Sequence, residues 1–397
     1  MDDATLGDRI RAVRMRRGLT QKELTAASGV SLSLLKKLES GALTTARPET
    51  LRTLAGPLDV TVSSLAAGPD EAPPHDDDVT VWEPVRSAID GTRAGAPDRE
   101  PTLAGVEAAC GEAVRLVLGS RFAEVRVLLP VLLRDADALT AAAGGDPAAR
   151  AARSRARQLA GFMLGQTWQL AAARYVLALA LDDGDGDPAA GPAAAAWLAW
   201  ARLRGGDLDG CAGLASDWAD RSEPRLTRAG RDEIAAWGRF QVTLATAAAR
   251  DNRDADAATA LRWARVAAVA VGKDFVPAGN PWDVFGPRTV AMASAEIALV
   301  QGDPARTLRI TERLDGKGFP VARNWLRSRL DVAAAHVCQG DDEEAVAVLA
   351  GVRDAAPEWL AQQRGARDTI AVLAGRPRRV IAAEVRALAD AVRLPLL

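Results

Sequence analysis

Hydrophobic positions recur at helical spacing along most of the chain and almost nowhere alternate as they would in a β-strand. Beyond residue 100, the amphipathic segments fall into pairs separated by short Gly, Asp or Asn breaks. The first helices of the predicted pairs lie near 102–118, 147–165, 189–204, 226–250, 283–301 and 320–339. Their partners lie near 121–143, 168–181, 208–220, 255–271, 303–314 and 342–354, and a last pair lies near 357–374 and 377–393. The pattern predicts an all-α protein.

Four of the breaks share a pattern of small side chains, and they begin at Gly206, Asn252, Gly302 and Gly340. Alanine lies seven residues before each break and a small residue lies five residues after it. The alanines are Ala199, Ala245, Ala295 and Ala333, and the later residues are Cys211, Ala257, Thr307 and Ala345. Small side chains allow the two helices of a hairpin to approach closely. Stacked hairpins of this kind form a cooperative solenoid with a concave inner surface.

These hairpins resemble the tetratricopeptide repeat, which carries small residues at the same offsets and often Pro after the second helix, as at Pro224 and Pro357. The resemblance covers most of residues 102–375. Successive small positions lie 46, 50 and 38 residues apart, whereas the repeat usually has about 34 residues. The resemblance implies a tetratricopeptide-like α-solenoid over residues 101–397.

The N-terminal segment has a denser pattern of helix signals. Thr20 followed by Glu23 is a capping box that predicts the start of a helix. Gly29 predicts its end, because Gly readily adopts a left-handed turn, and Ser31 is an N-cap candidate for the next helix. That helix turns its leucines inward at 35 and 38. Its opposite, exposed face carries Leu32, Ser33, Lys36 and Lys37.

Residues 6–66 resemble the lambda-repressor-like, or xenobiotic-response-element, helix-turn-helix regulators. The match rests on TQKEL opening the second helix, Gly-Val-Ser at the turn and Leu-Glu-Ser-Gly closing the third helix; Thr25 departs from the usual Ala. The resemblance implies a five-helix domain over residues 1–68 that binds double-stranded DNA and contains an internal Arg14–Glu39 pair. The implied DNA contacts are Gln21, Ser31, Leu32, Ser33, Lys36, Lys37 and Ser40. The alternative is a plain helical hairpin with a solvated lysine face.

Charge and composition separate this segment from the rest. Residues 1–68 hold 10 Lys and Arg against 7 Asp and Glu, whereas the remainder holds 40 Lys and Arg against 45 Asp and Glu. Only the N-terminal part is therefore suited by its charge to bind a polyanion.

Residues 69–100 include the acidic, Pro-rich stretch up to Asp78 and are predicted to be a linker, although Trp82, Val85 and Ile89 could begin the next domain. Three scattered cysteines, no apolar N-terminal signal and no long apolar run predict a reduced cytoplasmic protein without membrane contact.

A ligand is expected on the concave surface of the solenoid. The repeat pattern places ten candidate ligand-binding residues there: Trp200, Arg239, Trp282, Phe285, Thr289, Met292, Glu296, Arg323, Asn324 and Arg327. A peptide receptor needs amides for the backbone, guanidinium groups for a carboxylate and aromatic rings for side chains. Asn324 between Arg323 and Arg327 is the leading candidate. The alternative is that Asn324 is a solvated helix residue, and that most of the ten tryptophans fill gaps in an Ala-rich solenoid.

The sequence contains no metal-ligand spacing, phosphate-binding loop or nucleophile elbow, so neither an enzyme nor a cofactor is expected.

The whole arrangement resembles the peptide-pheromone receptors of Gram-positive bacteria and related actinobacterial regulators. The resemblance implies a cytoplasmic, homodimeric transcriptional regulator that binds a DNA operator and takes part in quorum sensing. Its solenoid would sense a small peptide and reset the spacing of two DNA-binding domains. The alternative is a protein-interaction adaptor whose solenoid docks a folded partner and whose helix-turn-helix tethers the complex to DNA.

Overall fold

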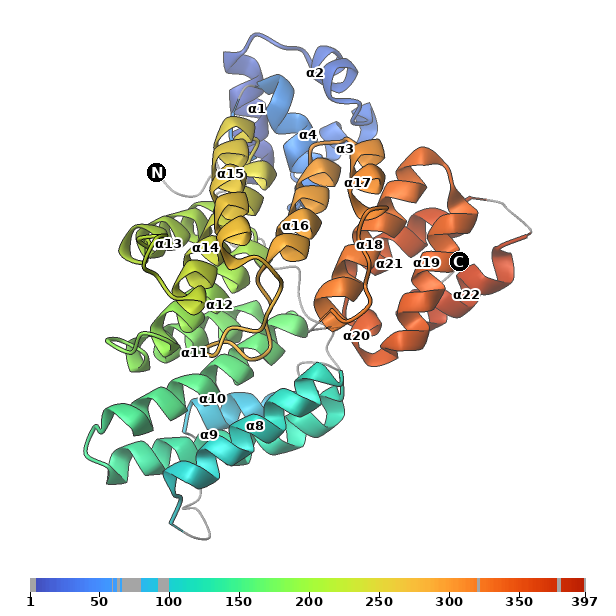
Figure 1. Cartoon of the computed structure of the whole chain (residues 1–397). Coiled ribbons are helices and arrows are strands. Elements are labelled where there is room, and N and C mark those ends of the chain that lie inside the picture. Colours follow the sequence, from blue (N-terminus) through green and yellow to red (C-terminus); the bar gives the residue numbers. More distant parts are fainter. Residues whose placement is uncertain are drawn as a thin grey trace.

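The computed structural model describes residues 5–58, 60–62, 65, 80–91, 100–319, 322–376 and 380–395. Within these ranges the chain is helical apart from turns, loops and an isolated antiparallel bridge between Phe275 and Phe285. A small lobe, residues 5–65, stands at one end, and the helices of residues 80–395 curve into an arc (Figure 1). We call these parts the head and the repeat region. The prediction of an all-α protein is confirmed.

The head contains α1 (Leu6–Arg16), α2 (Gln21–Ser28), α3 (Leu32–Glu39) and α4 (Pro48–Leu58). In the capping box that begins α2, Thr20 Oγ1 accepts from the Glu23 amide at 3.2 Å and Glu23 Oε2 accepts from the Thr20 amide at 2.7 Å. Gly29 ends α2 with φ 71°, and Ser31 Oγ accepts from the Leu34 amide at 3.2 Å to cap α3. The predicted helix signals are therefore confirmed. The expected fifth helix falls in a stretch of which only some residues are described, so it stays a prediction.

Gly7 brings α1 and α3 together. A Cβ at this position would lie 2.0 Å from the carbonyl oxygen of Leu38, so only a hydrogen fits between the two backbones. The core around this crossing is made of aliphatic side chains that are fully excluded from solvent: Ile10, Leu24, Leu35, Leu38, Leu54 and Leu58. This packing fixes the direction of α3 relative to the rest of the head.

The repeat region consists of paired helices over most of its length. The pairs are α8 (Leu103–Leu118) with α9 (Phe122–Ala142), α10 (Pro147–Gln166) with α11 (Leu170–Asp183), α12 (Ala190–Arg204) with α13 (Leu208–Arg221), α14 (Arg231–Arg250) with α15 (Asp254–Val271), α16 (Pro287–Val300) with α17 (Pro304–Thr311), and α18 (Ala322–Gln339) with α19 (Asp342–Ala355). They agree with the predicted pairs. The predicted helix over 357–374 is instead two, α20 (Pro357–Ala361) and α21 (Arg364–Ala374), and α22 (Ala382–Ala391) is the last described helix.

One turn geometry recurs between the helices of a hairpin. Gly206, Asn252, Gly302 and Gly340 all have positive φ, from 59° to 86°. After each of them, the next amide donates to the carbonyl five residues earlier, as Asp207 does to Arg202 at 3.0 Å. The eight small residues that flank these turns are all at most 1% exposed. The small-residue pattern therefore marks the close approach of paired helices, as predicted.

The same turn occurs at two places that the sequence pattern did not reveal. Ser120 and Trp168 have φ of 56° and 62°, and the amides of Arg121 and Gln169 make the same backbone hydrogen bond. Residues other than Gly and Asn rarely adopt this backbone conformation, so Ser120 and Trp168 give no sequence signal for a turn. Gly161, seven residues before Trp168, continues the small-residue pattern.

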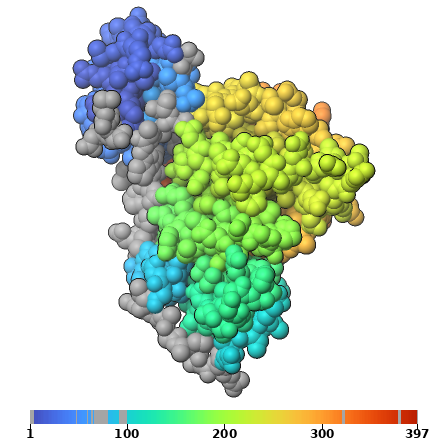
Figure 2. All heavy atoms as spheres, turned by 90° about the vertical axis from the view of Figure 1, so that its left-hand side faces the viewer, coloured from blue at the N-terminus to red at the C-terminus, as the bar shows by residue number. Residues whose placement is uncertain are grey.

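Part of the predicted linker is a packed helix. Trp82 and Val85, on or beside α7 (Glu83–Ile89), are 3% and 0% exposed and share a core with α8, α9 and α10. Figure 2 shows α7 in light blue beside the blue-green helices of that core. Residues 80–91 thus belong structurally with the repeats. The rest of the stretch 69–100 lies outside the described residues apart from residue 100, and the domain boundaries 1–68, 69–100 and 101–397 stay a prediction.

The two ends of the arc meet. The Phe122 amide donates to Glu358 Oε2 at 3.0 Å, and Trp168 Nε1 donates to the Gln362 carbonyl at 3.0 Å. Apolar residues of α8–α10 and α18–α22 form one continuous core cluster. We call the contact between α8–α10 and α18–α21 the seam. Because of the seam, the inner side of the arc is enclosed by helices (Figure 1).

The head docks through α4 on hairpin turns of the repeat region. The Arg52 carbonyl accepts from Asn252 Nδ2 at 3.1 Å, and Arg52 Nη2 lies 3.3 Å from Asp254 Oδ1. Leu208, at the start of α13, is 5% exposed and belongs to the apolar core of the head. The turns α12–α13 and α14–α15 therefore set the position of the head (Figure 1).

Candidate DNA interface and inner surface of the repeat region

The face of α3 directed away from the core of the head is polar and accessible. Ser33, Lys36 and Lys37 are exposed and Leu32 is half-buried, whereas the leucines at 35 and 38 are 0% exposed. These exposed side chains lie on one side of a short helix at i, i+3 and i+4 spacing. The arrangement can present hydrogen-bond donors and a small apolar group to the edges of base pairs.

Buried polar contacts hold the base of α3 against α1 and α2. Arg14 donates to Glu39 with Nε at 2.6 Å and Nη2 at 2.9 Å, and Gln21 Nε2 donates to Glu39 Oε2 at 2.8 Å. Burial opposes ionisation of Glu39, but the hydrogen bonds from Arg14 and Gln21 outweigh it and lower its pKa. The Arg14–Glu39 pair is confirmed. Gln21 is tied to the C-terminal end of α3, and both helices are thereby fixed relative to each other.

The remaining predicted DNA contacts are serines at the ends of α3. Ser31 is exposed, and its hydroxyl caps the helix. Ser40 is exposed, and its Oγ lies 3.3 Å from the Lys37 carbonyl. Both positions are accessible to a phosphate group. Their role in DNA binding stays a prediction.

Two of the predicted ligand-binding aromatics lie in the interior instead of on the concave surface. Trp282 and Phe285, in the loop 272–286, are 0% and 1% exposed. The loop folds inward, so that Trp282 stacks on Trp197 with centroids 6.1 Å apart. Arg323, 5% exposed, donates to the Trp282 carbonyl at 2.9 Å. These three side chains therefore hold the loop in place and offer almost no surface to a ligand.

Asn324, the leading candidate, is also engaged by this loop. Its Nδ2 donates to Asp283 Oδ1 at 3.2 Å, and Arg239 Nη2 donates to the same oxygen at 2.8 Å. Asn324 is thus half-buried and already hydrogen-bonded within the protein, instead of fully solvated as the alternative supposed; its role in ligand binding stays a prediction. The sequence pattern missed this because Asp283 and Asn324 are 41 residues apart along the chain.

Thr289 and Met292 of α16 are 6% and 7% exposed. Thr289 Oγ1 lies 3.4 Å from both Asp274 Oδ1 and the Val284 carbonyl. Met292 packs with Val284 and Phe319. Both residues therefore belong to the packing around the loop.

Two of the other predicted residues, Glu296 and Arg327, lie among charged neighbours. Arg250 Nη2 lies 2.6 Å from Glu296 Oε1, and Arg327 lies within the electrostatic reach of Glu296 and Asp331. Burial raises the pKa of Asp331 to about 7 against the opposing effect of Arg327. We call the following half-buried residues the inner cluster: Arg204, Arg250, Glu296, Arg327, Asp331 and Arg364. They come from α12, α14, α16, α18 and α21, so the inner side of the arc brings together residues far apart in sequence.

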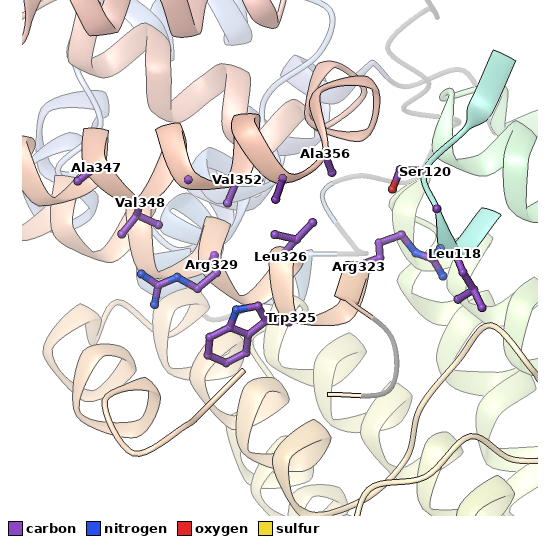
Figure 3. A pocket seen from close by; sticks show the side chains of 13 residues that line it. Leu118, Ser120, Arg323, Trp325, Leu326, Arg329, Ala347, Val348, Val352 and Ala356 are labelled. Atoms are coloured by element: carbon purple, nitrogen blue, oxygen red, sulfur yellow. The ribbon is translucent and has the colours of Figure 1, made fainter. Parts of the chain in front are cut away.

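A pocket of about 580 Å³ opens between α18, α19 and the turn from α8 to α9. Figure 3 shows Arg323 near Leu118 and Ser120, with Trp325 and Arg329 at the other end of the pocket. Its floor is formed by aliphatic side chains such as Leu326 and Val352. The pocket therefore combines aliphatic side chains with the guanidinium groups of Arg323 and Arg329.

Within the described ranges, no group of His, Cys, Asp and Glu is arranged to hold a metal ion. No described helix is both long and apolar enough to cross a membrane.

Residues 10–65 match the helix-turn-helix family model HTH_3. A crystal structure of Bacillus thuringiensis PlcR in complex with the peptide PapR7 and DNA resembles the chain with 13% identity and a TM-score of 0.34, covering 78% of this chain and 95% of that one. A search of curated proteins found no match. The matched residues include α2, α3, α4 and the part of α1 from Ile10 onward. The chain therefore carries at its N-terminus a DNA-binding helix-turn-helix domain of the lambda-repressor-like type, joined to a helical-repeat region.

Proposed function

We propose that the protein is a sequence-specific transcriptional regulator that binds its operator as a homodimer through α3. Its repeat region senses a small peptide or another small ligand and controls the geometry of the dimer. The observation that carries the DNA-binding part is the accessible face of α3, where Ser33, Lys36 and Lys37 stand over a rigid apolar core.

The side chains on this face match the chemistry of a major groove. Lys36 can donate to the guanine acceptors, and Leu32 can contact a thymine methyl group. Lys37 and Ser40 lie where they can bind phosphates, which position the helix without reading sequence. A dimer places two such helices about 34 Å apart for half-sites one helical turn apart.

The docking of the head supports a coupling between ligand and DNA. Since α4 contacts the turns α12–α13 and α14–α15 through Leu208 and Asn252, a change in the curvature of the arc moves the head. A ligand that binds one curvature more tightly than another shifts the population toward it. The two heads of a dimer would then be closer to, or further from, the spacing that the operator requires.

The inner cluster favours a small ligand over a folded protein partner. Four arginines and two carboxylates converge there, on a surface enclosed by the seam. A folded partner needs a wide accessible surface of roughly 800 Å² on each side. Short charged molecules fit an enclosed, arginine-rich surface better.

Selection of bound DNA from a random oligonucleotide pool by the purified full-length protein tests this proposal. We expect enrichment of inverted repeats whose half-site centres lie about 10 base pairs apart. Lys36→Glu should abolish the enrichment, and Lys273→Glu, which reverses an exposed lysine of the loop 272–286, should not. Absence of any enriched sequence at low salt, with correctly folded protein, would refute the proposal.

A further inference from the structure

Arg204, at the end of α12, has guanidinium nitrogens that no described residue satisfies. Its Nε and Nη2 are inaccessible to solvent and have no hydrogen-bond partner within the described ranges. The guanidinium lies over the ring of Trp168, 4.3 Å from the centroid, and 5.2 Å from that of Trp200. These contacts involve the face of the guanidinium, so the N–H groups of Nε and Nη2 remain donors without an acceptor among the described residues.

The charges around Arg204 do not compensate it. Burial lowers its pKa well below the ordinary value, and the charged groups that add to this effect are all cations, namely Arg327, Arg250 and Arg364. The carboxylates of the inner cluster, Glu296 and Asp331, act on Arg250 and Arg327 instead. A buried cation without an anionic partner is unfavourable, and an anion placed beside it removes that cost.

The aromatic surface under Arg204 is rigid. Trp200 lies against Gly165, where a Cβ would be 2.5 Å from the ring, and it stacks on Phe162 with centroids 5.5 Å apart. Trp168 is held by its hydrogen bond to the Gln362 carbonyl and by Arg364, which lies 3.7 Å over its ring. Residues of α10, α12 and α21 thus build one preorganised site at the seam.

We propose that Arg204, with Trp168 and Trp200 beneath it, is a binding site for the carboxylate of a small ligand. The planar fork of an arginine donates two parallel hydrogen bonds to the two oxygens of a carboxylate. The two tryptophan rings fix the plane of the guanidinium and therefore the direction of its N–H donors. The inference rests on the proposed function, because it assigns the anionic end of the ligand that the repeat region senses.

Two sources share this chemistry, the C-terminus of a short peptide and a free organic acid. Thermal unfolding of the full-length protein with three probes separates them. The probes are the N-acetylated dipeptide of alanine and leucine with a free carboxylate, the same dipeptide as its C-terminal amide, and propionate. We expect saturating free dipeptide to raise Tm by at least about 2 °C and the amide to have no effect. A response to propionate as large as that to the dipeptide assigns the site to small acids, and a smaller one assigns it to peptide ends.

Arg204→Met should remove the response to both carboxylates, because methionine keeps the apolar volume and loses the donors. The matched control is Arg221→Met, which removes an arginine lying 5.5 Å over the Trp218 ring on the exposed end of α13. That variant should respond as the wild type does. Should Arg204→Met fail to fold, Arg204→Lys keeps the charge but loses the fork, and the dipeptide should bind it roughly 10-fold more weakly.

Equal Tm shifts with the free dipeptide and its amide, or an unchanged carboxylate response in both Arg204 variants, would overturn the inference. Stabilisation by phosphate without any by carboxylates would overturn it as well. DNA selection by the same preparation is measured in parallel. Wild-type protein that selects DNA but does not respond to any carboxylate refutes this site alone. A specific carboxylate response in wild-type protein that selects no DNA refutes the regulator and leaves the site standing.

Discussion

The adjacent lysines of α3, Lys36 and Lys37, are expected to contact different parts of bound DNA. Lys36 shares the face of Leu32 and Ser33, whereas Lys37 is turned about 100° further around the helix, toward its edge. Both are exposed, so neither contributes to the core of the head. Their side chains differ in position and not in chemistry, which makes them a matched pair for separating base reading from phosphate binding.

We therefore expect Lys36→Ala to weaken binding to the selected operator by about 1–3 kcal/mol and to leave binding to random DNA nearly unchanged. Lys37→Ala should weaken both to a similar extent and lower the slope of log affinity against log salt by about 1. Fluorescence anisotropy titrations at several salt concentrations measure both effects. Equal losses on operator and random DNA for Lys36→Ala would contradict its assignment to base edges.

Asp331 makes the inner cluster sensitive to pH. Its pKa is raised by burial to about 7, so the folded protein retains a proton that the unfolded chain loses at lower pH. Its contribution to stability is therefore greatest below the unfolded pKa and is lost as the pH rises through about 7. Ionised Asp331 also adds negative charge to the cluster formed with Arg204, Arg250, Glu296, Arg327 and Arg364.

The free dipeptide carboxylate should accordingly bind more weakly at pH 8 than at pH 6, by roughly 3-fold. Asp331→Asn should show the tighter affinity at both values, because the amide stays neutral. Titration calorimetry at the two pH values with a common ionic strength provides the measurement. A pH dependence that persists in Asp331→Asn would show that another group is responsible.

At the scale of single elements, the helices and several of their junctions follow from local rules. The capping box at Thr20, the left-handed Gly29 and the small residues beside Gly206 each predict a local conformation that the structure contains. The hairpin turns at Ser120 and Trp168 have the same geometry without a residue that favours it, because packing of the neighbouring helices imposes the conformation. Local sequence signals therefore identify hairpins only where the turn residue is itself permissive.

The crossing of α1 and α3 provides a test at this scale. Gly7→Ala should push α3 away from α1, since the added Cβ would lie 2.0 Å from the Leu38 carbonyl oxygen. We expect a loss of about 1–3 kcal/mol in the local stability of the head and a weaker affinity for DNA. Hydrogen exchange measured by mass spectrometry should be faster in α3, because the head is less stable, and unchanged in α10–α16. Gly213→Ala, at an exposed helical position with no neighbouring atom within 4 Å of the added Cβ, is the control.

At the scale of the whole molecule, long-range contacts decide which residues face a ligand, and these contacts leave no periodic trace in the sequence. The loop 272–286 covers Asn324 and Arg239 through Asp283, and it buries its own Trp282. The repeat pattern placed Glu296 and Arg327 on the same surface, and the structure brings the two side chains within electrostatic reach of each other. The pattern could not reveal that Arg204 meets Trp168, because the turn between α10 and α11 and the end of α12 come together only when the hairpins stack.

The docking of the head is a whole-molecule feature that one substitution can test. Leu208→Asp places a charge in the apolar contact between α13 and the head, so the head should detach while remaining folded. Small-angle scattering should show a larger radius of gyration, and DNA selection should accept a wider range of half-site spacings. Leu226→Asp, at a 40% exposed position in the loop before α14, should change neither. If Leu208→Asp leaves the accepted half-site spacings unchanged, the docking of the head does not determine which operators the protein selects.

The seam makes the arc a closed loop of hairpins, and a closed loop cannot bend at one joint without a matching change at another. Trp168, in the turn between α10 and α11, donates to the Gln362 carbonyl next to α21, and Arg204 at the end of α12 lies over its ring. A molecule bound at this junction fastens the loop at the point where it would otherwise part. Binding of one small ligand at this site would then make the whole ring of hairpins more rigid. The head, which is docked on the hairpin turns, would become less mobile as well.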